Sequence, residues 1–317
     1  MKILAIETSF DETAAAIVED GTKIVTNVIA SSKEMHEKYG GVIPEIAARQ
    51  QLQSIIPVLT EALSGSNLKE MDALAVTTGP GLIGSLLVGV ETAKTIAMTT
   101  NLPLIPVNHV LAHMYANFID NTTIQFPAIS LVVSGAHTEL YLMKSMKDLK
   151  WLGGTVDDAA GECFDKTARL LGFGYGGGVA IEKAAVKGDI KLPRPMLDSS
   201  FNFSFSGLKT AVLREWKKRD NPRLAPVFAH EIQESITDVL VEKTLAAANE
   251  YGAKSILLSG GVAANKRLRE KFPREIHAPP PALCTDNAVF IGSYAYFRGN
   301  KQDWRSVNAA PDFSVEI

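Results

Sequence analysis

Cysteine is scarce in this sequence, which has only Cys163 and Cys284 among its 317 residues. Two thiols cannot form the framework of several disulfide bonds that stabilises small secreted domains. No apolar run reaches the roughly 20 residues that a transmembrane helix needs, and an acidic residue at Glu7 comes too early for a secretory signal peptide. The sequence therefore predicts a cytoplasmic protein without a membrane partner.

An excess of positive charge is also lacking. The sequence has 32 Lys and Arg against 35 Asp and Glu, which gives a formal net charge of -3 at pH 7. A chain with this balance does not attract nucleic acid over its whole surface, so any such contact needs a local basic patch or a helper protein. Two segments, 214–223 and 266–274, are rich in Lys and Arg and are the candidate patches.

No low-complexity linker interrupts the chain. Its length of 317 residues and hydrophobic content of 46% exceed what a single compact domain usually needs, so we expect two lobes. The first half shows β-branched strands, a helix that begins at Pro44, a buried strand, and a glycine-rich turn that leads into a second helix. The expected strands are 2–6, 14–18, 23–30 and 73–78, and the expected helices run from 44 to about 63 and from the turn 79–85 to about 99.

The same pattern begins again near Pro127. Strands at 128–133 and 139–143 flank a polar turn, and a late strand at 255–258 leads through a glycine turn into a helix at 266–271. This duplication predicts an α/β fold of two related lobes, like the ATPase domains of actin, sugar kinases and Hsp70 with their nucleotide cleft. Another α/β protein with glycine-rich turns is the alternative. We expect an N-terminal lobe at 1–107 and a C-terminal lobe at 108–317 that contains the metal site and a helical insertion.

Two histidines, His109 and His113, stand four residues apart and share one face if the segment is helical. Such a pair can bind one metal ion, although packing or surface roles are common for histidines at this spacing. Asp286, in the segment 284–287, is the expected third ligand. Two imidazoles and one carboxylate suit Zn²⁺ or Fe²⁺ better than Ca²⁺ or Mg²⁺. Cys284 is the second choice, because a lone buried cysteine is usually a small hydrophobic residue.

Acidic residues are dense at 157–166 and are followed by glycines at 176–178. Helix capping explains many such acids. A buried acid at Asp165 would also suit ribose hydroxyls, and Gly178 would let a ligand lie against bare backbone. Lys166 has two alternatives, which are a phosphate contact and an ion pair with a neighbouring acid.

Short motifs are spread over nearly the whole chain, at 7–13, 39–45, 109–113, 133–138, 164–166, 203–209, 260–265 and 284–287. This set, in this order, resembles the TsaD family of tRNA threonylcarbamoyladenosine transferases. Glu7, Thr8, Ser9 and His137 are similar to the bacterial and mitochondrial branch of that family.

The resemblance implies transfer of a threonylcarbamoyl group from threonylcarbamoyl-AMP to the exocyclic amine of the adenosine 3′ of the anticodon. The acceptors would be tRNAs that read codons beginning with A, and AMP would leave. The resemblance also implies one divalent metal ion, Fe²⁺ or Zn²⁺, on His109, His113 and Asp286. The implied adenylate contacts are Val132, Val133, Ser134, Gly135, Ala136, Asp165, Gly178 and Asn265, together with Glu182, which matches the archaeal branch.

Asp11 and Glu12, on the first polar turn, are our candidate catalytic residues for guiding the incoming amine. Some positions depart from the family pattern. Phe10 replaces a common cysteine, Ala136 replaces a glycine, and Gly176 stands where proline is frequent. The tail 308–312 lacks the Pro-Arg-Trp sequence of many bacterial members, which puts any contact made there in doubt.

Partners and alternatives follow from the same resemblance. A bacterial member would work with the inactive TsaD-like paralogue TsaB, the ATPase TsaE and the adenylate-producing synthase of the TsaC/Sua type, or as a homodimer. tRNA would bind the segment 214–223, or else the segment 266–274. An ATPase or small-molecule kinase of the same fold is the main alternative function, and a scaffold module is another. A peptidase is disfavoured, because no Glu follows His109 as in a zincin.

Overall fold

The computed structural model describes the chain except residues 33–34, 37–40, 121–122, 175 and 196–197. Tyr39 and Gly40 of the 39–45 motif therefore lie outside the described residues. The chain divides into two compact units, one of residues 1–123 with 285–317 and one of residues 124–284. This division differs from the expected boundary after residue 107. The reason is that His109 and His113 directly follow the last strand of the first sheet, and that the C-terminal helix packs on this sheet and brings Asp286 into the first unit.

The first unit contains a five-stranded sheet in the order β3-β2-β1-β4-β5. β1 pairs with β2 in the antiparallel and with β4 in the parallel direction. β4 is buried along its whole length, as expected for a strand covered on both faces, whereas β3 alternates between exposed and half-buried residues. The strands are β1 (Lys2–Glu7), β2 (Glu12–Glu19), β3 (Lys23–Ser31), β4 (Ala73–Gly79) and β5 (Leu104–Asn108).

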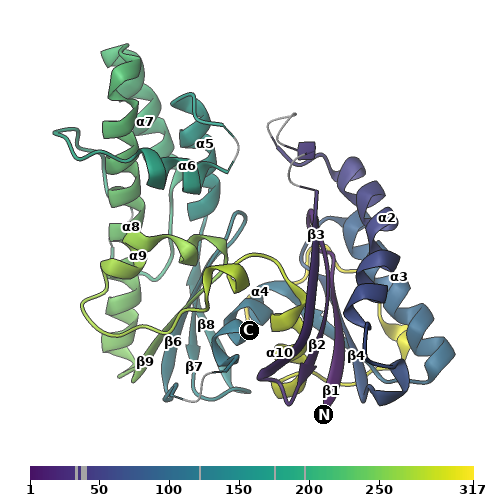
Figure 1. The fold of residues 1–317 in the computed structure, drawn as a ribbon. Coiled ribbons are helices and arrows are strands. Elements are labelled where there is room, and N and C mark those ends of the chain that lie inside the picture. Colours follow the sequence, from purple (N-terminus) through teal and green to yellow (C-terminus); the bar gives the residue numbers. More distant parts are fainter. Residues whose placement is uncertain (33–34, 37–40, 121–122, 175, 196–197) are drawn as a thin grey trace. The chain divides into compact units, whose positions relative to one another are not determined.

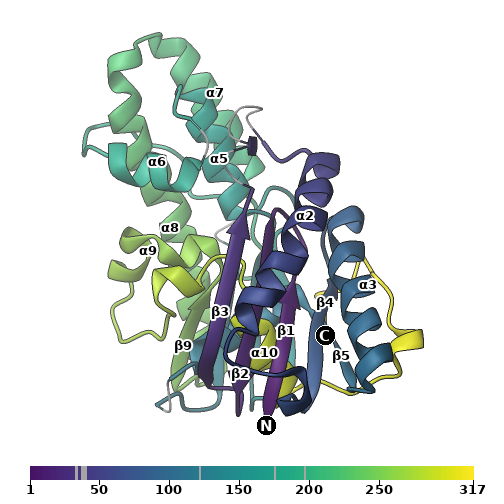
Figure 2. The ribbon, with the colours of Figure 1, turned by 45° about the vertical axis from the view of Figure 1, so that its right-hand side comes forward.

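Helices cover both faces of this sheet (Figures 1 and 2). α2 (Pro44–Ala62) and α3 (Ile83–Thr100) pack against each other and against one face, and α2 begins at Pro44 as expected. α10 (Ala288–Phe297) packs against β1 and β2. It is almost entirely apolar and buried. With this helix the chain returns from the second unit to the hydrophobic core of the first unit. The short helix α4 (His109–His113) follows β5 directly and contacts α10.

The second unit repeats the strand arrangement of the first. Its sheet has the order β8-β7-β6-β9, in which β6 is antiparallel to β7 and parallel to β9. β1 has the same relation to β2 and β4, so the predicted duplication is confirmed. The strands are β6 (Ala128–Val133), β7 (Thr138–Met143), β8 (Leu149–Gly154) and β9 (Ser255–Ser259).

Helices dominate the rest of the second unit. The long helix α8 packs against β6, α5, α6 and α7, and its buried Phe228 and Ile232 belong to the same core as Phe164. The helices are α5 (Ala160–Leu170), α6 (Gly177–Ala184), α7 (Ser206–Arg219), α8 (Ala225–Glu250) and α9 (Lys266–Glu270). Short 3-10 helices occur in the two units at Leu68–Glu70, Met114–Phe118, Pro222–Leu224, Gly261–Ala264, Pro281–Leu283 and Trp304–Ser306. Within the described part of the chain, no helix is both long and apolar enough to cross a membrane.

Candidate functional site

The two histidines lie on the short helix α4, as their spacing predicts. Asn108 caps the helix, because its side-chain oxygen accepts a hydrogen bond from the backbone N–H of Leu111 at 3.1 Å. His109 and His113 therefore stand one turn apart on the same face, with ring centroids 4.7 Å apart. Both side chains are buried.

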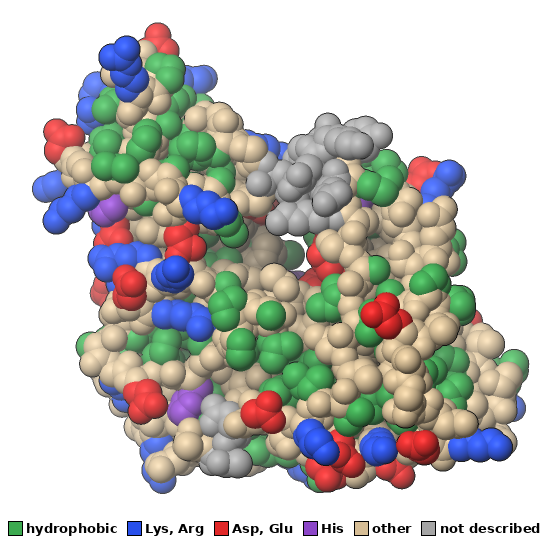
Figure 3. All heavy atoms as spheres, in the orientation of Figure 1, with side chains coloured by type: hydrophobic (Ala, Val, Ile, Leu, Met, Phe, Trp, Pro, Cys, Tyr) green, Lys and Arg blue, Asp and Glu red, His purple; other side chains and the backbone are tan. Residues whose placement is uncertain are grey.

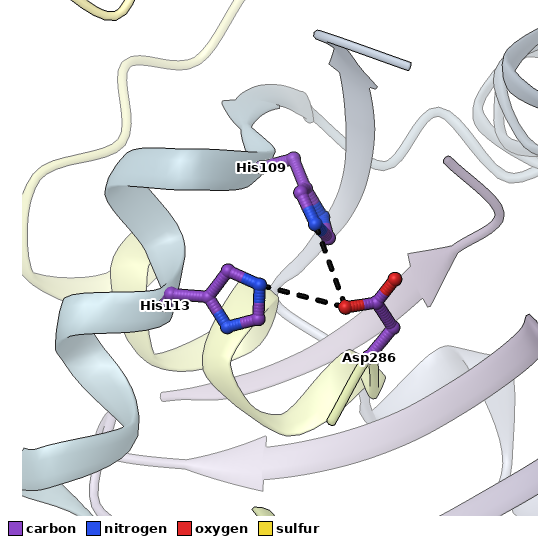
Figure 4. Close-up of side chains that lie close together, drawn as sticks. All are labelled: His109, His113 and Asp286. Atoms are coloured by element: carbon purple, nitrogen blue, oxygen red, sulfur yellow. Dashed lines mark ion pairs between the residues drawn. The ribbon is translucent and has the colours of Figure 1, made fainter. Parts of the chain in front are cut away.

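Asp286 completes a three-residue cluster, in which each residue offers one ligand atom and these atoms lie within 4.8 Å of one another. Figure 4 shows the three side chains pointing toward a common point. Oδ1 of Asp286 lies 3.6 Å from Nε2 of His109 and 3.4 Å from Nε2 of His113. Ligands about 2.1 Å from a zinc ion in tetrahedral geometry stand about 3.4 Å apart. The donor set and its spacing therefore fit a divalent metal ion.

The remaining nitrogen of His109 faces a carboxylate that sequence reasoning missed. Nδ1 of His109 lies 3.0 Å from Oε2 of Glu7, and the hydroxyl of Ser9 lies 3.2 Å from the same nitrogen. Glu7 is 1% exposed and also accepts hydrogen bonds from the Ser9 backbone and the Thr77 hydroxyl, each at 2.5 Å. Ligating histidines usually have such a partner for the second nitrogen. Glu7 belongs to the quoted 7–13 motif, but only the fold brings it to His109.

The two imidazoles have different electrostatic surroundings. Burial opposes the charge on His109, but the carboxylates of Glu7 and Asp286 outweigh it and raise the pKa of His109 to about 9. Burial lowers the pKa of His113. Nε2 of His113 is buried without a hydrogen bond to any described residue. An unsatisfied buried polar atom costs about 1–3 kcal/mol, so this nitrogen is a group that a ligand would stabilise.

The predicted catalytic acids lie on the turn between β1 and β2. Asp11 is buried, and the side chain of Glu12 accepts a hydrogen bond from the Ser31 hydroxyl at 3.0 Å. Burial, together with a hydrogen bond to Asp11, raises the pKa of Glu12 to about 9, and the charge of Asp286 contributes in the same direction. Gln51 of α2 donates to the backbone oxygens of Thr8, Phe10 and Glu12 and thereby holds the turn.

Cys284, the second choice as a ligand, has a different environment from Asp286. Its sulfur lies 3.5 Å from the backbone oxygen of Pro279 and 3.4 Å from the guanidinium of Arg269. Burial raises the pKa of the Cys284 thiol, which disfavours the thiolate that a metal would need. Among the described residues, the cluster with metal-ligand spacing consists of His109, His113 and Asp286 and does not include this cysteine.

The predicted adenylate contacts all lie in the second unit, on segments joined by hydrogen bonds. The turn that follows β6 contains Ser134, whose backbone oxygen accepts from Gly161 at the start of α5. Gly260, after β9, packs so closely that a Cβ there would lie 2.3 Å from the backbone oxygen of Val133. Gly135 and Ala136 are exposed at the tip of the turn, whereas Val132 and Val133 are buried.

The other predicted contacts connect α5, α6 and α9. Asp165 is half-buried rather than buried, and it lies within α5, where its side chain accepts from the backbone N–H of Gly177 at 2.8 Å. Glu182 accepts from the backbone N–H of Lys266 at 2.8 Å. Asn265 caps α9 and donates to Gln233 at 2.9 Å. Gly178 has open space on its Cβ side, apart from Phe164 Cβ at 4.0 Å.

Lys166 forms ion pairs with neighbouring acids, which was the second of its two expected roles. Its ammonium group pairs with Asp158 at 2.8 Å and with Glu162 at 2.7 Å. Asp158 also binds Lys209, at 2.6 Å, so that one carboxylate joins α5 to α7. Lys166 therefore has two carboxylate partners within the protein.

Comparison with known proteins identifies the family. The family model for TsaD, tRNA N6-adenosine threonylcarbamoyltransferase, matches residues 23–293. A protein of that name from Dehalococcoides mccartyi is 49% identical, and the match covers 99% of each chain. Another from Thermomicrobium roseum is 48% identical over 99% of this chain and 95% of the relative.

The chain belongs to the TsaD family. Its activity is that of a tRNA N6-adenosine threonylcarbamoyltransferase, as the resemblance in the motifs predicted. Among solved structures, component A of the (R)-2-hydroxyglutaryl-CoA dehydratase of Acidaminococcus fermentans is similar, with a TM-score of 0.58 and 18% identity over 93% of this chain and 98% of that one. Full-length HypF gives a TM-score of 0.62 and 13% identity over 93% of this chain and 46% of its own. Together with the duplicated sheets, these neighbours confirm the expected fold of two actin-like α/β lobes for this chain.

Proposed function

We propose that this chain transfers the threonylcarbamoyl group of threonylcarbamoyl-AMP to N6 of the adenosine 3′ of the anticodon, in tRNAs that read codons beginning with A, and that the transfer is metal-assisted. The observation that carries the metal-assisted step is the cluster of His109, His113 and Asp286. Two imidazoles with one carboxylate suit Fe²⁺ or Zn²⁺, one ion per chain. Such an ion supplies a Lewis acid with open coordination positions.

The reaction forms one bond and breaks one bond. N6 of the adenosine attacks the carbamoyl carbon, the bond from that carbon to the phosphate oxygen breaks, and AMP leaves with the electron pair while the proton of the amine passes to water. The donor is an activated mixed anhydride, so that the enzyme has to supply positioning and charge stabilisation rather than a strong nucleophile.

Asp11 and Glu12 are the residues that we assign to the amine. The raised pKa of Glu12, about 9, keeps this carboxyl protonated at neutral pH, so that it acts as a hydrogen-bond donor. A hydrogen bond joins its side chain to that of Asp11. We infer that the side chain of Asp11 accepts a hydrogen bond from N6 and orients the amine. Gln51, which fixes the turn, supports this geometry.

The second unit would bind the adenylate. In the turn 134–136, the exposed Gly135 and Ala136 offer backbone N–H groups for the phosphate, and Asp165 offers a carboxylate for ribose hydroxyls. Gly178 would allow the adenylate to lie flat against the backbone, and Asn265 would contribute its side-chain amide as a further contact. Val132 and Val133 support the turn from β6, while Glu182 is the weakest member because it already accepts a hydrogen bond from the backbone N–H of Lys266.

The segment 214–223 is the tRNA surface that we favour. Lys217, Lys218 and Arg219 are exposed at the end of α7, and Lys and Arg side chains gather over that end of the second unit (Figure 3). The segment 266–274 is largely engaged elsewhere. Arg267 and Lys271 pair with Glu234, at 2.6 Å and 2.9 Å. Charges that already have partners release fewer counterions from a phosphate backbone.

A protein partner is expected on the outer faces of α2 and α3. Leu52 and Ile56 of α2 are 65% and 63% exposed, and Leu87 of α3 is 45% exposed. They line a groove between the two helices, where apolar residues repeat at a spacing of four. We propose that the inactive paralogue TsaB covers this groove with helices of its own, while a homodimer is the alternative occupant. TsaE and a TsaC/Sua-type synthase are further partners that the family implies.

One experiment tests the reaction. The protein, supplied with threonylcarbamoyl-AMP, a metal ion, partner proteins and a tRNA with an adenosine 3′ of its anticodon, should give modified tRNA and AMP in equal amounts. Mass spectrometry of the digested tRNA detects the product. Without tRNA, AMP release should be slow, because the acceptor amine is missing. Brisk ATP hydrolysis with no modified nucleoside under any partner combination would instead support the ATPase or kinase alternative.

A further inference from the structure

The segment after Trp304 lies against the part of the first unit that holds the metal ligands. Val307 is buried, and Trp304 and Ala309 pack against the core of this unit. From residue 310 onward the chain is half-buried or exposed, and its contacts are mainly hydrogen bonds. Its sequence is one of the places where the chain departs from the family pattern.

The first contact involves the cap of the metal-ligand helix. Asn108 is 3% exposed, and both its side-chain oxygen and its side-chain nitrogen form hydrogen bonds. Its oxygen accepts from Leu111 within α4, and its nitrogen donates to the backbone oxygen of Ser314 at 3.0 Å. The side-chain amide of Asn108 therefore joins the tail to the first turn of α4, the helix that contains both histidine ligands.

The second contact involves the loop after β4. The backbone N–H of Ala310 donates to Thr78 at 2.7 Å, and that of Gly81 donates to Pro311 at 3.2 Å. The approach is close, because a Cβ on Gly79 would lie 1.8 Å from the backbone oxygen of Ala310. Glycine is needed at that position for this reason.

The same loop is connected to Nδ1 of His109 through Ser9. The backbone N–H of Leu82 donates to the backbone oxygen of Ser9 at 2.9 Å, and the hydroxyl of Ser9 lies 3.2 Å from Nδ1 of His109. The tail therefore contacts α4 directly through Asn108 and approaches His109 a second time through the loop 79–82 and Ser9.

We propose that residues 310–314 act as a positioning segment for the metal site, with Asn108 as the positioning residue through which they act. The inference rests on the proposed metal role of His109, His113 and Asp286. Helix α4 has only five residues and cannot fix its own orientation through internal hydrogen bonds. Strand β5 and helix α10 hold α4 in place, and the tail adds a hydrogen bond at its N-terminus that helps to set the direction of the two imidazoles. Second-sphere contacts of this kind typically change metal affinity by about 10–100-fold.

The test measures the dissociation constant for Zn²⁺ by competition with a chelating dye. It compares the full chain, a variant that ends at Ala309, and Asn108→Ser, which keeps an N-cap oxygen but removes the donor to Ser314. Each change should weaken Zn²⁺ binding about tenfold. The double variant should bind no more weakly than the shortened variant alone, because the shortened chain has already lost the contact between Asn108 and Ser314. Ser314→Ala is the matched control, since it keeps the backbone oxygen, and should bind like the full chain.

Thermal unfolding separates positioning from a purely structural role. The metal-free melting temperature of the shortened variant should stay close to that of the full chain, because Trp304 and Val307 remain, while the increase produced by Zn²⁺ should become smaller. Equal affinity in the full chain, the shortened variant and Asn108→Ser would overturn the inference. If His109→Ala bound Zn²⁺ as tightly as the full chain, the proposed metal site itself would fail, which is a distinguishable result.

Discussion

Nδ1 of His109 and Oε2 of Glu7 lie 3.0 Å apart in a buried environment. Glu7 accepts hydrogen bonds from two other donors, and the charge on His109 helps to lower the pKa of Glu7 against the opposing effect of burial. An ionised carboxylate can only accept, so Nδ1 bears a proton. The raised pKa of His109 keeps a second proton on Nε2 near neutral pH, and a metal ion would displace that proton and leave the tautomer with Nδ1 protonated, which a metal ligand requires.

Glu7→Gln should therefore weaken metal binding about 10–100-fold, because the amide no longer provides the negative charge that polarises the imidazole. Isothermal titration with Zn²⁺ measures the change. Thr77→Val is the matched control, since it removes one donor to the same carboxylate but keeps its charge. We expect a smaller loss for Thr77→Val, and equal affinities for Glu7→Gln and the original protein would contradict the tautomer argument.

Removing a ligand should remove the metal while the fold persists. His113→Ala and Asp286→Ala should lose most of the bound metal in elemental analysis, and far-ultraviolet circular dichroism should be unchanged, because an open three-ligand site contributes less to folding than a closed structural one. Cys284→Ala should keep its metal, since the sulfur contacts Arg269 and Pro279. Full occupancy in a His113→Ala, Asp286→Ala double variant would exclude this site.

Charge reversal at the end of α7 should weaken tRNA binding. Replacing Lys217, Lys218 and Arg219 by Glu should lower affinity and reduce the slope of log affinity against log salt by about 2–3, because up to three phosphate contacts are lost. Filter binding at several salt concentrations gives the slope. Arg269→Gln is the comparison, because this guanidinium is engaged with backbone oxygens of Ala263 and Pro279. An unchanged slope in the triple variant would place the tRNA surface elsewhere.

Introducing charge into the groove between α2 and α3 should prevent assembly with the paralogue. Ile56→Lys and Leu87→Lys should each weaken the complex at least about tenfold, because a buried apolar anchor becomes an unpaired charge. Analytical ultracentrifugation reads the association, and metal content should be unaffected. Val179→Lys, at another exposed apolar position, is the control. A complex that forms normally with both groove variants would argue against this surface.

Glu234 predicts how stability depends on pH. Hydrogen bonding from Arg267, with a further contribution from Lys271, lowers the pKa of Glu234 from 4.5 to about 2 despite its partial burial. The folded state therefore favours the ionised form, so its stabilising contribution is present above about pH 4.5 and is lost as the pH falls toward 2. Glu234→Gln should lower the melting temperature at pH 7, and the difference should shrink below pH 4.5. A difference independent of pH would contradict the assigned pKa.

Much of the secondary structure was predictable because it depends on local patterns. The apolar spacing that follows Pro44 indicated α2, and β-branched runs indicated β1, β2 and β6. The expected bounds agree with the structure within a few residues. β8 was missed because only part of it is buried, which leaves a weak periodic signal.

The sequence by itself determined the duplication, the spacing of His109 and His113 and the family, because each of these is recorded in the order of residues along the chain. The tertiary structure decided which distant groups meet. It brought Asp286 to the histidines, although the whole second unit separates them in sequence. It placed Glu7 against Nδ1 of His109. It also paired Arg267 and Lys271 with Glu234 instead of leaving them free. The physical reason is that such contacts join residues far apart in sequence, where local propensity carries no information and only the packing of strands and helices sets the distance.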